Sequence, residues 1–281
     1  MAQVGSALRS GRRGRGFKSR LPDQKASTDY CNQVAGFQVY GEGEVIDPTG
    51  RVMMISGANR GIGAALAQQF HSDGWIVSLG ARNIGDLRSS IQGWADQDVS
   101  CHEYDALDPA SGDAWVNATM DLHGRVDGLT NNAGIGHMES LADLSEDVLD
   151  EMWAVNVKGP LHLIRQALPL LAASGEGRIV NVVSLSGKRV KGTFAPGYAM
   201  SKHAFLALHH AVRHATFDDG IRVTAICPGY VETDMTSSFG VDPAIMIQPE
   251  DLAETVATVV RLPNTATVAE VLMTCEPEVL G

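Results

Sequence analysis

The segment 198–202, which reads YAMSK, places a tyrosine and a lysine four residues apart. On a helix, residues at i and i+4 lie on the same face, so the two side chains would be neighbours. A free tyrosine has a pKa of about 10, and an ammonium within ~4–6 Å stabilises the phenolate and lowers that pKa. Tyr198, with Lys202 beside it, could then exchange a proton with a substrate oxygen. This spacing is common by chance, so it needs support from the rest of the chain.

Two polar residues upstream could serve the same proton transfer. Ser184 ends an apolar run, and Ser186 follows as a rival. Asn156, a poor helix former, lies in a helical stretch four residues before Pro160. Because proline has no N–H, it removes the hydrogen bond that the Asn156 carbonyl would accept, and it bends the helix. The free carbonyl could hold an ordered water in a proton path, or the bend could serve packing alone.

The stretch 52–63, VMMISGANRGIG, reads as a buried strand, a glycine turn and the start of a helix. A helix N-terminus has unpaired N–H groups and a partial positive charge, and glycines let backbone approach phosphate oxygens closely. The pattern therefore indicates a site for a nucleotide pyrophosphate. Its spacing is Gly-x-x-x-Gly-x-Gly rather than the commoner Gly-x-Gly-x-x-Gly, and an ordinary loop is the alternative.

The residues after the second β-like run indicate which dinucleotide would bind. Positions 80–83 contain no Asp or Glu, the residue type that binds the ribose hydroxyls of NAD. Arg82 lies there instead, and Arg60 lies in the glycine turn. Two guanidinium groups suit a 2′-phosphate, so NADP(H) is favoured and NAD(H) is less favoured. Either arginine alone could also be a solvated surface residue.

Two further turns follow the third and fourth β-like runs. Asp105 could accept a hydrogen bond from an adenine amino group, or it could stabilise the turn before the next helix. The four residues 131–134, NNAG, would let the backbone approach a cofactor, and their amides could tie neighbouring strands together. In isolation NNAG is also simply a good turn.

From residue 51 onward, β-like runs alternate with helical patterns, which predicts a parallel sheet with helices on both faces. The predicted fold is an α/β single domain with a doubly wound, seven-stranded parallel sheet. In such sheets ligands bind beyond the carboxyl ends of the strands, where the residues above lie. The predicted strands are 51–56, 75–80, 99–104, 128–131, 178–184, 221–227 and 267–273, and the predicted helices are 62–72, 84–95, 109–123, 145–173, 197–218 and 249–262.

Composition excludes several function classes for these 281 residues. A formal net charge of -11 argues against a nucleic-acid surface. No apolar run approaches the ~18–20 residues of a membrane span. The four cysteines lack metal-type spacing and suit a reducing compartment, so we expect a cytoplasmic protein. We expect no metal site, because the four histidines between 203 and 214 fit a subunit interface or an exposed face better.

Residues 1–48 are predicted to be a basic, largely disordered extension before a domain over 49–281. The first 20 residues contain six Lys or Arg and no acid, and they lack apolar periodicity. An organelle transit peptide is an alternative, although the glycines disfavour an amphipathic helix. A misassigned start is another.

Taken together, these motifs occur in one order at mutually consistent spacings. They are SGANRGIG, Asp105, NNAG, Asn156, Ser184, the Tyr198/Lys202 pair and a final PGYVET over 228–233. From about residue 50 to 275 the chain resembles the short-chain dehydrogenase/reductase family. Ser56 is a departure, since the family usually has threonine there, but a hydroxyl is retained.

The resemblance implies a Rossmann fold and hydride transfer between a nicotinamide and a carbonyl or alcohol carbon. Tyr198 would be the general acid/base, and Lys202 would bind the nicotinamide ribose and lower the tyrosine pKa. Ser184 would polarise the substrate oxygen; it fits better than Ser186, because the family serine is followed by two residues and a glycine. Asn156 would hold the relay water through its carbonyl, and Thr233 would hold the nicotinamide carboxamide. The family is commonly homodimeric or homotetrameric.

The same resemblance assigns the two ends of the site. The residues that would line the dinucleotide are Gly57, Asn59, Arg60, Gly61, Ile62, Gly63, Arg82, Asp105, Asn132, Ala133, Gly134, Tyr198, Lys202, Pro228, Gly229 and Thr233. Those that would face a small-molecule substrate are Ser184, His137, Arg189, Phe194 and Tyr230. The short segment between Thr233 and the last helix predicts an open pocket.

The leading hypothesis is an NADP(H)-dependent carbonyl reductase or alcohol dehydrogenase. The alternative is a non-catalytic NADP(H)-binding regulatory protein of the same fold. The intact set of Asn156, Ser184, Tyr198 and Lys202 favours the enzyme, because a sensor need not keep its acid/base. An epimerase or dehydratase relative is a third reading, but those usually run longer at the carboxyl end.

Overall fold

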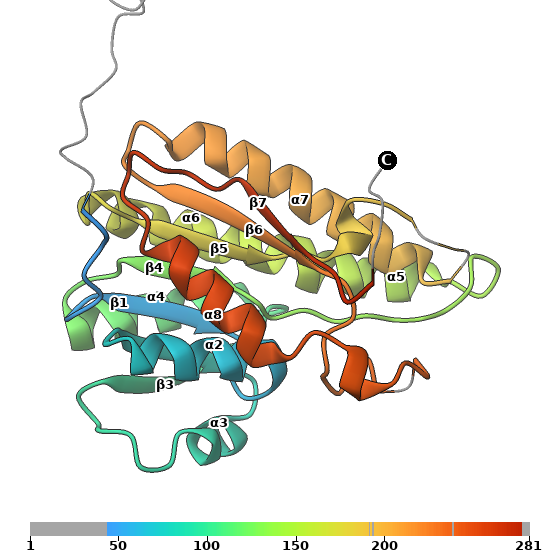
Figure 1. Cartoon of the computed structure of the whole chain (residues 1–281), viewed down its shortest axis with the longest axis horizontal. Coiled ribbons are helices and arrows are strands. Elements are labelled where there is room, and N and C mark those ends of the chain that lie inside the picture. Colours follow the sequence, from blue (N-terminus) through green and yellow to red (C-terminus); the bar gives the residue numbers. More distant parts are fainter. Residues whose placement is uncertain (1–43, 191, 193, 238, 277–281) are drawn as a thin grey trace, which may run out of the picture. The chain divides into compact units, whose positions relative to one another are not determined.

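A seven-stranded, wholly parallel sheet forms the centre of the computed structural model, which describes residues 44–190, 192, 194–237 and 239–276 (Figure 1). The strand order is β3-β2-β1-β4-β5-β6-β7, so the chain first runs to one edge of the sheet and then returns past β1 to the other. The predicted seven-stranded, doubly wound sheet is confirmed. The strands are β1 (Val52–Ser56), β2 (Ile76–Ala81), β3 (Val99–Glu103), β4 (Gly128–Asn131), β5 (Arg178–Val182), β6 (Arg222–Pro228) and β7 (Glu270–Met273).

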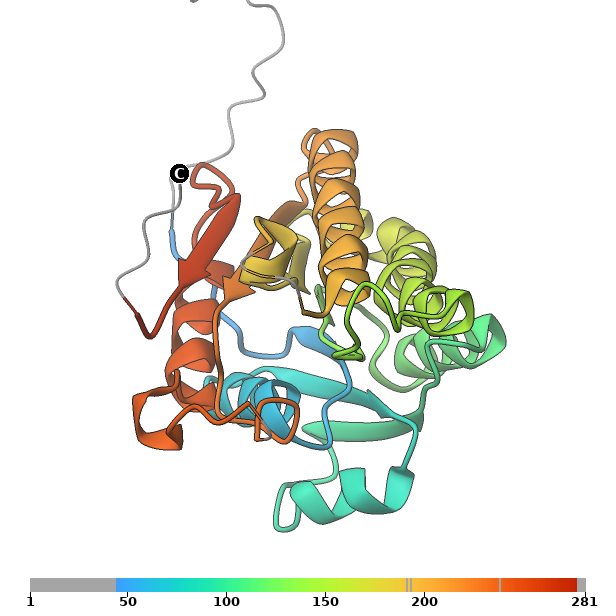
Figure 2. The same cartoon turned by 90° about the vertical axis from the view of Figure 1, so that its right-hand side faces the viewer.

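Helices cover both faces of the sheet, and Figure 2 shows the two layers on either side of it. The helices α2 (Gly61–Ser72), α3 (Ile84–Ser90) and α8 (Pro249–Val260) pack on one face. The helices α4 (Pro109–His123), α6 (Gly159–Ala173) and α7 (Pro196–Thr216) pack on the other. Between them lie α5 (Glu146–Trp153) and three short turns, η1 (Ala154–Lys158), η2 (Leu185–Gly187) and η3 (Pro243–Ile245).

Strand β1 illustrates why the strands read as continuous apolar runs. Met53 and Ile55 point into the layer below α2 and α8, whereas Met54 points into the opposite layer with Trp115. All of these side chains are fully buried. A parallel strand covered on both faces has no solvent side, so it shows no alternation of polar residues.

The predicted single helix over 145–173 is wrong in one respect, because a π-helical turn interrupts it at η1. The Gly159 N–H donates to the Ala154 carbonyl five residues back, and Pro160 follows with no N–H to continue the ladder. A π turn is a recognised cause of a helix bend. The helix is therefore interrupted around Asn156 by a change of hydrogen-bond register, and the predicted bend stays a prediction.

Two other predicted boundaries differ from the structure by three residues or more. The helix predicted over 84–95 ends at Ser90, before Gly93, which has a φ of +91° that no α-helix accommodates. The last strand begins at Glu270 rather than at 267, because only Glu270–Met273 pairs with β6.

The described chain begins inside the predicted extension. Residues 1–43 of that extension lie outside the described residues, but 44–48 are described. Ile46 is only 3% exposed, and its N–H donates to the Arg261 carbonyl over 2.8 Å. The packed domain thus includes a few residues before position 49. None of the helices in the described residues is long and apolar enough to span a bilayer.

Candidate active site

The predicted site residues gather around one cavity of about 1160 Å³ at the carboxyl ends of the strands. Two predicted residues, Gly63 and Asn156, are missing from its walls. The predicted residues that line it are Gly57, Asn59, Arg60, Gly61, Ile62, Arg82, Asp105, Asn132, Ala133, Gly134, His137, Ser184, Arg189, Phe194, Tyr198, Lys202, Pro228, Gly229, Tyr230 and Thr233.

The glycine turn connects β1 to α2, and two of its glycines have backbone angles that favour glycine. Gly57 has a φ of +65° and Gly61 a φ of +54°. Gly63 has a different function, because a Cβ there would lie 2.1 Å from the Gly57 carbonyl oxygen. Gly63 therefore allows α2 to pack against the turn, which explains why it lies behind the cavity wall.

Ser56 ties the NNAG turn to the glycine turn. Its Oγ accepts hydrogen bonds from the backbone N–H groups of Asn132 and Ala133, both over 3.0 Å. The Asn132 side-chain amide donates back to the carbonyls of Ser56 and Gly57 over 3.0 and 3.1 Å. The expected tie between neighbouring strands is therefore present, and a hydroxyl at position 56 is sufficient for it.

Of the two predicted cations, Arg82 lies at the end of the cavity beyond β2, whereas Arg60 pairs with a residue on the segment after β6. Arg82 is exposed at the end of β2. Arg60 donates to Asp234 over 2.8 Å, a partner that the sequence analysis did not find. Asp105 lines the cavity and also stabilises a turn, because its Oδ1 accepts from the Leu107 N–H over 3.0 Å. Both expectations for Asp105, a cavity position and a turn residue, are compatible with this placement.

The first turn of α2 faces the cavity without a capping side chain. Arg60 is the N-cap residue, and its side chain makes no capping hydrogen bond. The N–H groups of this turn are therefore available to an anion, with the positive end of the helix dipole behind them. Together with the glycine turn and the arginines, this donor set fits the phosphates of a dinucleotide.

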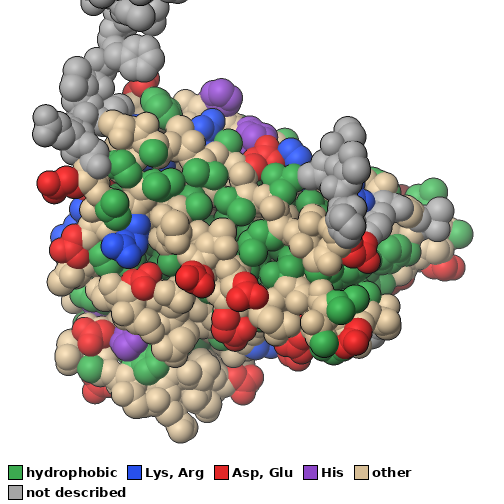
Figure 3. All heavy atoms as spheres, viewed as in Figure 1, with side chains coloured by type: hydrophobic (Ala, Val, Ile, Leu, Met, Phe, Trp, Pro, Cys, Tyr) green, Lys and Arg blue, Asp and Glu red, His purple; other side chains and the backbone are tan. Residues whose placement is uncertain are grey.

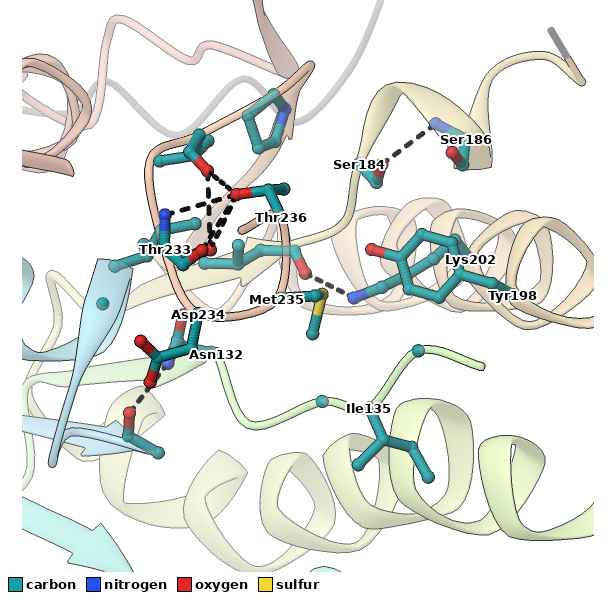
Figure 4. A pocket seen from close by; sticks show the side chains of 18 of the residues that line it. Asn132, Ile135, Ser184, Ser186, Tyr198, Lys202, Thr233, Asp234, Met235 and Thr236 are labelled. Atoms are coloured by element: carbon teal, nitrogen blue, oxygen red, sulfur yellow. Dashed lines mark hydrogen bonds between the residues drawn. The ribbon is translucent and has the colours of Figure 1, made fainter. Parts of the chain in front are cut away.

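Tyr198 and Lys202 leave α7 on the same face, as their spacing predicts (Figure 4). The Lys202 ammonium donates to the Val182 carbonyl over 3.0 Å and lies 5.7 Å from the centre of the Tyr198 ring. The lysine residue is 5% exposed, and burial lowers its pKa from 10.5 to about 8. The ammonium form thus persists at neutral pH, but the Lys202 pKa lies closer to neutral pH than that of a surface lysine.

Tyr198 lies beside Ser184, which follows β5. Burial raises the Tyr198 pKa, and a hydrogen bond with Ser184 acts in the opposite direction. The expected lowering of this pKa by Lys202 is therefore wrong for the protein alone, where burial dominates and the opposing influence is the Ser184 hydrogen bond. Ser186 donates its backbone N–H to the Ser184 Oγ over 3.0 Å and so orients that hydroxyl. Of the two rival serines, Ser184 is the one whose side chain meets Tyr198.

Asn156 lies behind the cavity, where its side chain connects three segments. Its Oδ1 accepts from the Ile135 N–H over 2.9 Å, and its Nδ2 donates to the Ile135 carbonyl over 2.9 Å and to Ser201 Oγ over 3.0 Å. Ser201, which the sequence analysis did not single out, in turn donates to the Tyr198 carbonyl over 2.8 Å. Its position in the sequence, between Tyr198 and Lys202, could have indicated that Ser201 belongs to the site.

The other end of the cavity has an aromatic wall. The Phe194 and Phe239 rings meet edge to face with 6.3 Å between centroids, and Tyr230 meets Phe239 in the same way at 6.0 Å. Sequence analysis missed Phe239, which lies in the segment after Thr233. His137, also on this side, pairs with Glu151 over 3.3 Å.

Comparison with known proteins agrees with this arrangement. The family model described as short chain dehydrogenase matches residues 51–243, which contain the glycine turn, Ser184, Tyr198 and Lys202. The chain belongs to the short-chain dehydrogenase/reductase family. Its members are oxidoreductases, and the resemblance inferred from the motifs is confirmed.

Individual members of the short-chain dehydrogenase/reductase family share the fold and much of the sequence. The agropine synthesis reductase of Rhizobium rhizogenes is 38% identical over 229 residues, which are 81% of this chain and 53% of that protein. This chain thus spans about half the length of the first curated relatives that it matches. An alcohol dehydrogenase from Thermococcus sibiricus, complexed with 5-hydroxy-NADP, is 29% identical with a TM-score of 0.72, over 79% of this chain and 95% of that one. A 3-ketoacyl-(acyl-carrier-protein) reductase from Brucella melitensis, complexed with NADH, is 26% identical with a TM-score of 0.75, over 81% and 98%.

Proposed function

We propose that this protein is an NADP(H)-dependent oxidoreductase that transfers a hydride between the nicotinamide and a carbonyl or alcohol carbon of a small substrate. The observation that carries the proposal is the arrangement of Tyr198, Ser184 and Lys202 at one cavity. The tyrosine hydroxyl lies beside the serine, and the lysine ammonium lies behind the ring (Figure 4). This arrangement can transfer a proton to or from a substrate oxygen.

In the direction of reduction, a bound reduced nicotinamide would supply the hydride that the carbonyl carbon accepts. Tyr198 donates its hydroxyl proton to the carbonyl oxygen, so that an alcohol forms. Ser184 donates a second hydrogen bond to the same oxygen and stabilises the charge that develops there. Its position is fixed by the N–H of Ser186. Burial raises the Tyr198 pKa, which keeps the proton on the hydroxyl before the reaction.

After the transfer, the buried Lys202 ammonium lies close to the Tyr198 phenolate. The ammonium lies 5.7 Å from the ring centre, and in this buried site it stabilises the anion more strongly than it would across the same distance in bulk water. In this proposal the lysine also donates hydrogen bonds to the nicotinamide ribose. Asn156 acts as a positioning residue, because its side chain holds the Ile135 backbone and the Ser201 hydroxyl.

The preference for NADP(H) rests on the charges around the end of β2. Positions 80–83 carry no carboxylate, and Arg82 is exposed at the cavity. A carboxylate there would repel the 2′-phosphate, whereas a guanidinium group binds it. One related structure is complexed with 5-hydroxy-NADP and another with NADH, so the family supports both cofactors and the local residues decide.

The test is turnover measured at the absorbance band of reduced nicotinamide, with NADPH and then NADH. The panel contains aldehydes, ketones, keto acids and a β-ketoacyl thioester. Tyr198→Phe is the matched variant, because it removes one hydroxyl and leaves the ring. We expect turnover with NADPH, and a loss of roughly 10²–10⁴-fold in the variant with NADPH binding retained.

Two other results would overturn parts of the proposal. NADPH binding without turnover on any substrate, in wild type and variant alike, would favour the non-catalytic regulatory alternative. A higher kcat/KM with NADH than with NADPH would contradict the interpretation of Arg60 and Arg82.

A homo-oligomer is part of the proposal. Strand β7 is the sheet edge, and apolar side chains gather over it on the face shown in Figure 3. Leu272, on that strand, is 38% exposed. A second copy of the chain would cover this edge, which otherwise exposes unpaired backbone groups. Light scattering after gel filtration should give the molar mass of a dimer or tetramer. Leu272→Lys should lower that mass towards the value of a monomer. A monomeric wild-type protein would exclude the assembly.

We further propose a cytoplasmic location. Cys101, Cys227 and Cys275 are free thiols, which is the usual state in a reducing compartment. Cell fractionation with thiol labelling tests this, and recovery of the protein in an oxidising compartment or an organelle would contradict it.

A further inference from the structure

The ion pair between Arg60 and Asp234 lies at the rim of the cavity. The Arg60 Nη1 donates to the Asp234 Oδ2 over 2.8 Å, and the two side chains are 69% and 74% exposed. Arg60 precedes α2 in the glycine turn. Asp234 follows Thr233 on the segment after β6 (Figure 4). Both residues line the cavity.

The two segments that this pair joins are in contact beside it. A Cβ at Gly61 would lie only 3.1 Å from the Thr233 Cγ2, so the glycine turn and the segment after β6 approach each other closely. The proximity of the two backbones keeps Asp234 within reach of Arg60. This carboxylate occupies the Nη1 donor of the arginine and offsets part of its charge, so it competes with any other anion in the cavity for the guanidinium group.

Arg60 and Arg82 therefore differ in availability. Within the part of the chain that the structure describes, Arg82 makes no ion pair, whereas Arg60 is held by Asp234. An arginine already paired to a carboxylate contributes less to phosphate binding, because the carboxylate occupies a donor and offsets the positive charge.

We propose that Asp234 is a specificity-determining residue, which restrains Arg60 and reduces the preference of the site for NADP(H) over NAD(H). The inference rests on the proposed function, in that a nicotinamide dinucleotide binds in this cavity. It adds that the 2′-phosphate competes with Asp234 for Arg60. NAD(H), which has no such phosphate, binds with the ion pair intact.

The displacement is feasible because the pair is weak and the competitor is strong. An exposed ion pair contributes little free energy, since water and salt screen both charges. A phosphate monoester carries a charge of about −1.5 to −2 at neutral pH and offers three acceptor oxygens, so it binds arginine better than one carboxylate does. The cost of breaking the pair corresponds to about a twofold to fivefold loss of NADP(H) affinity.

The test is direct measurement of dissociation constants for NADPH and NADH, by calorimetry or by quenching of protein fluorescence. Asp234→Asn is nearly isosteric and frees Arg60. We expect about twofold to fivefold tighter NADPH binding, with a smaller change for NADH. Glu232→Gln is the matched control, because it removes the same charge two residues away on the same exposed segment. It should change the affinities for both cofactors by the same factor.

A double-mutant cycle separates this inference from general electrostatics. In an Arg60→Gln background, Asp234→Asn should no longer increase the selectivity for NADPH. Persistence of the effect without Arg60 would overturn the inference. Equal weakening of NADPH and NADH binding by Asp234→Asn alone would also overturn it, because the ion pair would then close the site over either dinucleotide. Absence of binding for either cofactor in the wild type would instead refute the proposed function itself.

Discussion

The side chain of Asn156 donates to the Ser201 hydroxyl over 3.0 Å, and Ser201 donates to the Tyr198 carbonyl over 2.8 Å. This short chain joins the π-helical turn to the helix that carries the proposed acid/base. It is fully buried, with Asn156 at 1% and Ser201 at 0% exposure. The position of Tyr198 therefore depends on a residue that does not touch the cavity.

Asn156→Ala should be strongly destabilising. It removes three hydrogen bonds and leaves the Ile135 N–H and carbonyl without their side-chain partner, which costs about 2–4 kcal/mol of unfolding free energy. Ser201→Ala removes one neutral bond and should cost about 1 kcal/mol. Urea denaturation measures both. Equal losses in the two variants would contradict the dominant role of the Ile135 bonds.

Lys202→Met should stabilise the fold and abolish activity. The Lys202 pKa falls from 10.5 unfolded to about 8 folded, so burying the charge disfavours folding by about 3 kcal/mol at neutral pH. Methionine removes that cost but leaves the Val182 carbonyl without its donor, so we expect a net gain of about 1–3 kcal/mol. The difference between wild type and variant should shrink as pH rises from 8 to 10.5, because only the unfolded lysine then still binds a proton. A destabilised variant at pH 7 would contradict this account.

Cofactor affinity should fall as pH rises through about 8. A lowered folded-state pKa means that the free protein loses the Lys202 ammonium near that pH, and with it the donor to the ribose. Tyr198→Phe should keep the same profile, because the titrating group is the lysine. Binding titrations between pH 6 and about 10 test this. If the pH dependence of cofactor affinity disappears in Tyr198→Phe, the titrating group is Tyr198 rather than Lys202.

Much of the fold and the centre of the site could be predicted from sequence for a simple reason. The carboxyl ends of parallel strands meet at one edge of the sheet, so residues that follow separate strands, such as Gly57, Asn132 and Ser184, come together there. The spacing of Tyr198 and Lys202 needs only helical periodicity to place both on one face. These inferences depend on local sequence pattern and on sheet topology, and both can be predicted from the amino-acid sequence.

The remaining features depend on tertiary contacts without a local signature. Arg60 and Asp234 are 174 residues apart, and no pattern joins them. Asn156 was assigned a role for its carbonyl, whereas the structure describes three bonds of its side chain. The direction in which the Tyr198 pKa shifts depends on burial and on the opposing hydrogen bond with Ser184. Neither effect can be judged from the spacing of Tyr198 and Lys202.

Gly63→Ala should disrupt the glycine turn. The added Cβ would lie 2.1 Å from the Gly57 carbonyl oxygen and 2.5 Å from the Asn132 side-chain nitrogen, so α2 or the turn must shift. We expect a loss of about 1–3 kcal/mol in stability, and weaker NADPH and NADH binding by similar factors. Gly124→Ala is the control for backbone strain, since it has a φ of +73° but no atoms within 4 Å of the added Cβ. Unchanged cofactor binding in Gly63→Ala would show that the turn does not hold the dinucleotide.

Arg178→Lys should cost stability without affecting chemistry. Arg178 is 3% exposed at the start of β5, the opposite end from the cavity, and donates to the carbonyls of Val260 and Leu262 and to the Asn264 side chain over 2.7–2.9 Å. A lysine has three donors on one atom and cannot reproduce this planar fork, so we expect a loss of about 2–4 kcal/mol in guanidinium denaturation. The exposed Arg88→Lys should stay within about 0.5 kcal/mol. Because the site is remote, kcat per folded molecule should stay at the wild-type value; a fall in kcat at full folding would mean that the two ends of the sheet are coupled.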